Sequence, residues 1–116
     1  ADEVLVQVSY AIGVAEPCGL YINTYGTSKV NFSDSEIAHK VNKLFDLRPF
    51  AIEQNLKLRN PIYLETASYG HMGREYYTAD KTFNKGKSNE KTINDLEFFT
   101  WEKLDRVEDI KKEFSL

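Results

Sequence analysis

The sequence predicts an α+β fold, with a mainly antiparallel sheet and helices packed on one face. Apolar and polar residues alternate over residues 4–13 and 19–25, which is the pattern of β-strands. The short connection over residues 14–18 favours an antiparallel hairpin, because a parallel return needs a crossover of about a dozen residues. An apolar stripe with helical spacing follows at Ile37, Val41, Leu44 and Phe45.

Two helices are expected in the middle of the chain. Ser33 and Glu36 have the spacing of a capping box, so the first helix should begin near Asp34. Pro49 suits the first position of a short second helix that runs through Leu56. The side chains expected to face water on the first helix are His39, Lys40, Asn42 and Lys43. Those expected on the buried side of the second are Phe50, Ile52 and Leu56.

The second half of the chain is less regular. Alternation over residues 62–67 predicts another strand. Residues 78–97 are dominated by polar and charged side chains, which indicates a mobile surface loop. A terminal helix is expected to be capped by Asp105, with Glu108 at its third position. Its apolar face would comprise Leu104, Val107, Ile110 and Phe114.

Composition excludes some classes of function. The chain has 116 residues and a formal net charge of −3, so it lacks the basic excess that nucleic-acid binding requires. Its longest apolar run is too short to cross a bilayer. A single cysteine, Cys18, cannot form an internal disulfide and suits a reducing compartment. We therefore expect a cytoplasmic protein that binds neither nucleic acid nor membrane.

His71 and Arg74 are the candidates for chemistry, because they lie among glycines in the string YGHMGR. A histidine can transfer a proton near neutral pH, and a small hydrolase using His71 is one reading. In the favoured alternative, Gly70 and Gly73 adopt turn conformations, and Arg74 pairs with a carboxylate or a chain terminus. Four lysines, at 81, 85, 87 and 91, are interleaved with acidic residues, which favours a solvated segment over a phosphate site.

Four separated strings resemble the C-terminal part of S-adenosylmethionine synthetase, also called methionine adenosyltransferase. They are QVSYAIGVAEP (7–17), FDLRP (45–49), PIYLETASYGHMGRE (61–75) and TWEK (100–103), in the order of that family. The resemblance implies one part of the C-terminal domain of an enzyme with three similar α+β domains. It also implies that residues 1–116 lie in that domain and that residues 78–97 are an inserted surface loop.

The resemblance further implies an activity of one-carbon metabolism. Enzymes of this family join ATP and L-methionine into S-adenosylmethionine and release phosphate and diphosphate. Magnesium, potassium and lysines stabilise charge on the triphosphate leaving group. The subunits form homo-oligomers, dimers or tetramers, with active sites between them. Ile12 matches the family isoleucine at the end of a strand, which forms part of the apolar wall of the methionine pocket.

The family's catalytic and metal-binding motifs are not among the matched strings. By resemblance, this chain therefore supplies scaffold and part of the methionine-pocket wall, holds no metal or cofactor by itself, and shows no turnover alone. The alternative is a free-standing interaction module that keeps the fold without the chemistry. An open reading frame that continues upstream of Ala1 would favour the first reading over the second.

Overall fold

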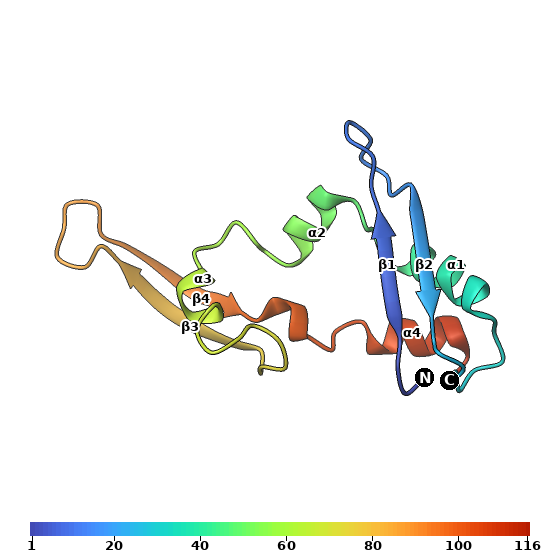
Figure 1. Cartoon of the computed structure of the whole chain (residues 1–116). Helices are drawn as coiled ribbons and strands as arrows, with labels where there is room; N and C mark the ends of the chain where they lie inside the picture. Colours follow the sequence, from blue (N-terminus) through green and yellow to red (C-terminus); the bar gives the residue numbers. More distant parts are fainter. The chain divides into compact units, whose positions relative to one another are not determined.

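The computed structural model describes all 116 residues, which form two compact units. Unit 1 comprises residues 1–52 and 106–116, and unit 2 comprises residues 53–105. Each unit has its own two-stranded antiparallel sheet and its own cluster of buried apolar side chains (Figure 1). The predicted α+β class is confirmed. None of the helices has the length and apolar character needed to span a bilayer.

Unit 1 begins with the predicted hairpin. β1 (Leu5–Ser9) pairs antiparallel with β2 (Gly19–Asn23), and Val6 lies opposite Ile22. The hairpin is confirmed, with strands shorter than the sequence alternation suggested. The backbone N–H of Cys18 donates to the carbonyl of Ser9 over 2.8 Å, which closes the hairpin at the ends of the strands.

Helix α1 (Asp34–Leu44) starts as predicted, with a complete capping box. The backbone N–H of Glu36 donates to Ser33 Oγ over 3.3 Å, and the N–H of Ser33 donates to Glu36 Oε2 over 2.8 Å. These two bonds satisfy backbone donors that the first turn of a helix leaves free. Helix α2 (Pro49–Asn55) also begins at the predicted proline and contains the boundary between the units.

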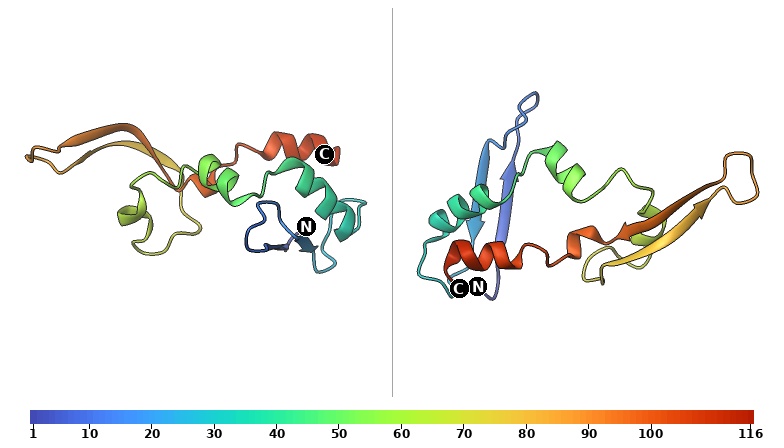
Figure 2. Two further views of the ribbon diagram at one scale, coloured as in Figure 1. Left: turned by 90° about the horizontal axis from the view of Figure 1, so that it is seen from above. Right: turned by 180° about the vertical axis from the view of Figure 1, so that it is seen from behind.

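The core of unit 1 joins β2, α1 and α4 (Val107–Phe114) through Ile22, Ile37 and Phe114. Both views in Figure 2 show α1 and α4 close together beside the β1–β2 hairpin. The predicted cap at Asp105 is wrong, because α4 begins at Val107 without a side-chain cap. Leu104 therefore lies outside the helix and is exposed.

Lys40 also departs from its predicted place in water. Its ammonium lies 4.7 Å from the centroid of the Phe32 ring and donates to the backbone carbonyl of Glu113 over 2.8 Å. A lysine can bury its aliphatic stem against an apolar surface while its charged end finds polar partners. Lys40 lies outside the apolar stripe of α1, but α4 covers it. The sequence pattern of α1 alone could not predict this contact with a distant helix.

In unit 2, the expected surface loop over residues 78–97 is wrong. β3 (Tyr77–Phe83) and β4 (Lys91–Phe98) form an antiparallel hairpin with an irregularity between Ala79 and Lys81. Backbone pairing satisfies the main chain of this polar segment, while its scattered apolar residues pack against one cluster. Leu96 belongs to this buried cluster, and Ala79, Phe83 and Ile93 pack against it. That the segment is an insertion relative to the family stays a prediction.

The strand expected over residues 62–67 is wrong as well, because the structure has a short helix there, α3 (Tyr63–Thr66). Ile62 and Thr66, four residues apart, are the buried positions. The Thr66 hydroxyl donates to the carbonyl of Ile62 over 3.2 Å. Ile62 packs with residues of β4 and the segment after it, which leads into a 3₁₀ turn, η1 (Thr100–Glu102).

Candidate functional site: the β1–β2 loop

The β1–β2 loop (residues 10–18) presents the residue that sequence reasoning placed in a ligand pocket. The backbone N–H of Val14 donates to the carbonyl of Ala11 over 3.1 Å, which defines a turn with Ile12 and Gly13 at its centre. Gly13 has φ +83°, as the third residue of a type II turn requires. Any side chain at this position would be strained. The turn leaves the Ile12 side chain fully exposed, at 106%.

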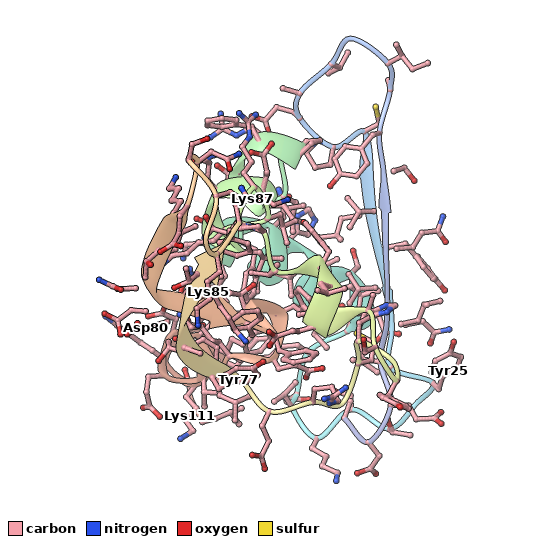
Figure 3. All side chains as sticks on the ribbon, turned by 90° about the vertical axis from the view of Figure 1, so that its left-hand side faces the viewer. Tyr25, Tyr77, Asp80, Lys85, Lys87 and Lys111 are labelled. Atoms are coloured by element: carbon pink, nitrogen blue, oxygen red, sulfur yellow. The ribbon has the colours of Figure 1, made fainter.

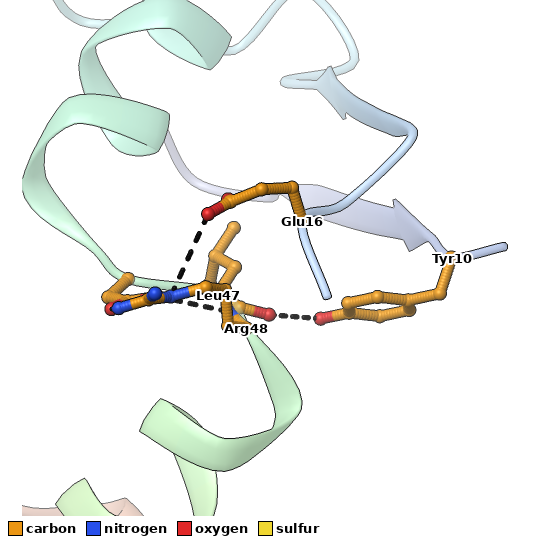
Figure 4. Close-up of polar contacts among 5 residues, drawn as sticks. Tyr10, Glu16, Leu47 and Arg48 are labelled. Carbon is orange, nitrogen blue, oxygen red and sulfur yellow. Dashed lines mark hydrogen bonds and ion pairs between the residues drawn. The ribbon is translucent and has the colours of Figure 1, made fainter. Parts of the chain in front are cut away.

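Both arms of the loop contact the segment between α1 and α2 (Figure 4). The Tyr10 hydroxyl donates to the backbone carbonyl of Leu47 over 2.5 Å. Beyond the turn, Glu16 Oε1 lies 3.8 Å from Arg48 Nε. The loop is therefore attached to the FDLRP segment on both sides of Ile12.

Arg48 is itself braced by a neighbouring carboxylate. Its Nε donates to Asp46 Oδ1 over 2.9 Å, and its backbone N–H donates to the same oxygen over 3.1 Å. Hydrogen bonding from Arg48 lowers the pKa of Asp46, and the same side-chain bond raises the pKa of Arg48. Both groups therefore stay charged, and the guanidinium has a fixed partner.

A shallow groove of about 450 Å³ runs beside the turn. It is lined by Gly13, Val14, Ala15, Arg48, Pro49 and Phe50. Phe50 is 68% exposed, so its prediction as a buried residue of α2 is wrong. These side chains offer apolar contact and one guanidinium, but no group that could transfer a proton near neutral pH.

Ile12 therefore lies in the loop, three residues beyond the end of β1 at Ser9. The sequence placed it at the end of the strand. No side chain of unit 1 covers it, which leaves the whole side chain available for contact. Its role as a pocket wall stays a prediction. The sequence did not predict the contact between Tyr10 and Leu47. The acceptor is a backbone carbonyl, which every residue has, so no residue type at position 47 could indicate it.

His71 and Arg74 lie in unit 2, in a turn held by the TWEK segment. Gly70 and Gly73 have φ values of +87° and +67°, so the predicted turn conformations are confirmed. The Trp101 indole donates to the carbonyl of His71 over 2.6 Å, and Glu102 Oε1 accepts from the N–H of Gly73 over 2.6 Å. The strings 61–75 and 100–103 thus meet in a structural contact.

Arg74 does not pair with a carboxylate, so that prediction is wrong. Its Nη1 donates to the carbonyls of Ser68 and Gly70, over 3.1 and 3.2 Å. The guanidinium also lies 4.8 Å from the centroid of the Phe99 ring. Carbonyl oxygens and an aromatic face can satisfy a guanidinium without an acid. Arg74 therefore closes the turn around His71.

The lysines of the β3–β4 hairpin differ in their surroundings. Figure 3 labels Lys85 and Lys87 of the connecting turn and Asp80 of β3, and all three are exposed. Lys81 is half-buried and forms an ion pair with Glu65. No three His, Cys, Asp or Glu side chains in the chain gather as a metal site.

Glu97, in β4, is the most strongly perturbed carboxylate of the chain. Its Oε1 accepts from Lys103 Nζ over 2.6 Å and from the Tyr76 hydroxyl over 2.8 Å. Lys57 Nζ lies 2.5 Å from Oε2. The contacts with Lys103, Lys57 and Tyr76 outweigh desolvation and lower the pKa of Glu97 to about 2. This cluster joins three segments of unit 2.

Comparison with known proteins identifies close relatives over the whole chain. Residues 1–85 match the family described as S-adenosylmethionine synthetase, C-terminal domain. The chain is 65% identical over 116 residues to the S-adenosylmethionine synthase of Flavobacterium johnsoniae. It is 63% identical over 116 residues to that of Phocaeicola vulgatus. These alignments cover 100% of the chain but only 28% and 27% of the relatives, so the chain spans little more than a quarter of their length.

Proposed function

Because the chain belongs to the S-adenosylmethionine synthetase family, as a C-terminal domain sequence, we propose that it serves the synthesis of S-adenosylmethionine from ATP and L-methionine. Family membership confirms the resemblance found in the sequence. The observation that carries the proposal is identity of 65% and 63% to named synthases along the full chain. In this reaction the methionine sulfur attacks the ribose 5′ carbon, and the triphosphate released is hydrolysed to phosphate and diphosphate.

Within that reaction, we assign this chain the scaffold and part of the methionine-pocket wall. Ile12 stands free on an ordered turn beside an apolar groove, which suits van der Waals contact with an apolar substrate side chain. Magnesium and potassium would neutralise triphosphate charge in the whole enzyme. The acidic and imidazole groups of this chain form no cluster that fits such an ion, so we derive no step through it.

Assembly and location form part of the same proposal. We expect the whole enzyme to be a cytoplasmic homo-oligomer, a dimer or a tetramer, without nucleic-acid or membrane partners. The exposed apolar residues Val4, just before β1, and Val6, within β1, support burial of this surface of the hairpin in a larger protein.

The test of the wall assignment is Ile12→Ala in the full-length polypeptide that carries this chain. Loss of most of the side chain should raise the KM for methionine at least about tenfold, because even one methylene in a pocket contributes about 1–3 kcal/mol to recognition. The KM for ATP should not change. Leu64→Ala is the matched control, because Leu64 is an exposed aliphatic side chain of unit 2 that does not line this groove. An unchanged methionine KM in Ile12→Ala would contradict the assignment.

We further expect the isolated 116-residue chain to produce no S-adenosylmethionine from ATP, methionine, magnesium and potassium. The groove beside the β1–β2 loop offers one guanidinium, Arg48, which is already paired with Asp46, and the chain has no cluster of acidic groups that would hold a metal ion on the triphosphate. Product can be measured by chromatography, with the full-length enzyme as the positive control. Turnover by the isolated chain would show that it contains a complete active site.

A further inference from the structure

We infer that Tyr10 is a positioning residue for methionine recognition, because its hydroxyl holds the turn that presents Ile12. The inference rests on the proposed function, since it names a residue that acts through the proposed pocket wall. It concerns unit 1 alone, where the loop, its anchor and the groove all lie.

The loop has little internal structure to fix the direction of its tip. One backbone hydrogen bond forms the turn, from Val14 to Ala11, and another closes the base, from Cys18 to Ser9. All residues from 11 to 16 are exposed, so packing does not hold them. An exposed segment with few buried contacts opens easily. The position of Ile12 therefore depends on the side chains that tie the loop to its surroundings.

Tyr10 makes the stronger of the two ties. Its hydroxyl reaches the Leu47 carbonyl over 2.5 Å, across 37 positions of sequence. The acceptor lies in a short segment braced on both sides. Before it, Asp46 accepts from the backbone and side chain of Arg48, and after it the N–H of Ile52 donates to the carbonyl of Arg48 over 3.0 Å. The Tyr10 hydroxyl therefore donates to a backbone carbonyl whose position is fixed by its neighbours.

The second tie, between Glu16 and Arg48, is weaker. The two charged atoms are 3.8 Å apart and both side chains are largely exposed, at 73% and 48%. Solvent and salt screen such a pair. Arg48 also has Asp46 as a closer partner. We therefore assign the positioning role to Tyr10 rather than to the ion pair.

The test is Tyr10→Phe in the full-length enzyme, which removes only the hydroxyl. A net hydrogen bond of this kind corresponds to about a three- to tenfold change in an equilibrium. We expect the methionine KM to rise about three- to tenfold, with kcat, the ATP KM and the melting temperature unchanged. Tyr21→Phe is the matched control, because Tyr21 lies in β2 of the same hairpin with an exposed side chain whose hydroxyl makes no hydrogen bond.

A double variant tests whether Tyr10 acts through Ile12. If it does, Tyr10→Phe added to Ile12→Ala should raise the methionine KM no further than Ile12→Ala alone. Additive effects would overturn the inference. So would a Tyr10→Phe enzyme that loses stability and raises both KM values, because that result indicates a general structural role.

Amide hydrogen exchange separates this inference from the proposed function. Tyr10→Phe should speed exchange of the hydrogen-bonded amides of Val14 and Cys18, whereas Tyr21→Phe should not. Unchanged exchange would overturn the anchoring role even if Ile12 contacts methionine. If exchange accelerates while Ile12→Ala leaves the methionine KM unchanged, the wall assignment fails and the anchor stands.

Discussion

Replacing Ile62 with alanine is expected to lower the free energy of unfolding of unit 2 by about 2–5 kcal/mol. Ile62 is 1% exposed and packs with three other buried side chains, Leu96, Phe98 and Phe99. Truncation removes buried carbon atoms and leaves a cavity among rigid aromatic rings, which cannot close around it. Urea denaturation of the chain measures the loss. Trp101, the single tryptophan, packs against this cluster and reports on its unfolding by fluorescence.

Leu64→Ala is the matched control, two residues further along and 88% exposed. It removes an aliphatic side chain of the same size from helix α3 without opening a cavity, so its effect should stay within about 0.5 kcal/mol. Equal losses in the two variants would show that Ile62 does not anchor this core. The comparison also checks the correction of the predicted strand, because alternation along a strand would put Ile62 and Leu64 on one face.

The sequence correctly predicted the elements that depend only on a few neighbouring residues. The capping box of Ser33 and Glu36 needs only the first turn of α1, and it is present as expected. The β1–β2 hairpin followed from a connection too short for any other pairing. Such features depend little on the rest of the chain, so sequence reasoning found them.

Features that depend on distant partners were not visible in the same way. Alternation over residues 62–67 fitted a strand, but the core selects Ile62 and Thr66, which share one side of a helical turn. A short run cannot distinguish these periods by itself. The β3–β4 hairpin was missed because its stability comes from backbone pairing across two polar segments. Composition alone described those segments as a loop.

The same distinction between local signals and contacts with distant residues applies to the candidate site. Ile12 could be named only through family resemblance, because one isoleucine after a strand carries no chemical signal. Tyr10 fell within the strand predicted over residues 4–13, and its contact with Leu47 joins positions 37 apart. The acceptor is a carbonyl that any residue would provide. Arg48 belonged to a recognised string, but its bonds to Asp46 became visible only in the structure.

Glu97→Gln should also destabilise unit 2 strongly, by about 2 kcal/mol at pH 7. The substitution keeps the shape of the side chain but removes the charge that binds Lys103 and Lys57. The Glu97 side chain is 12% exposed and is therefore largely shielded from solvent. The Lys57 side chain is half-exposed, so solvent screening reduces the stabilisation that this ion pair contributes. Urea denaturation followed by Trp101 fluorescence measures the difference. Glu75→Gln, at an exposed carboxylate without a bonding partner, is the control.

The pH dependence identifies the charge as the cause. The folded-state pKa of Glu97 is lowered from 4.5 to about 2, so the unfolded chain takes up this proton first as the pH falls. The stabilisation is therefore complete above about pH 5 and is lost between about pH 4.5 and pH 2. The difference between the native chain and Glu97→Gln should shrink over this window, because a protonated glutamate resembles glutamine. A difference that stays constant down to pH 2 would show that packing, and not the ionised carboxylate, holds the three segments together.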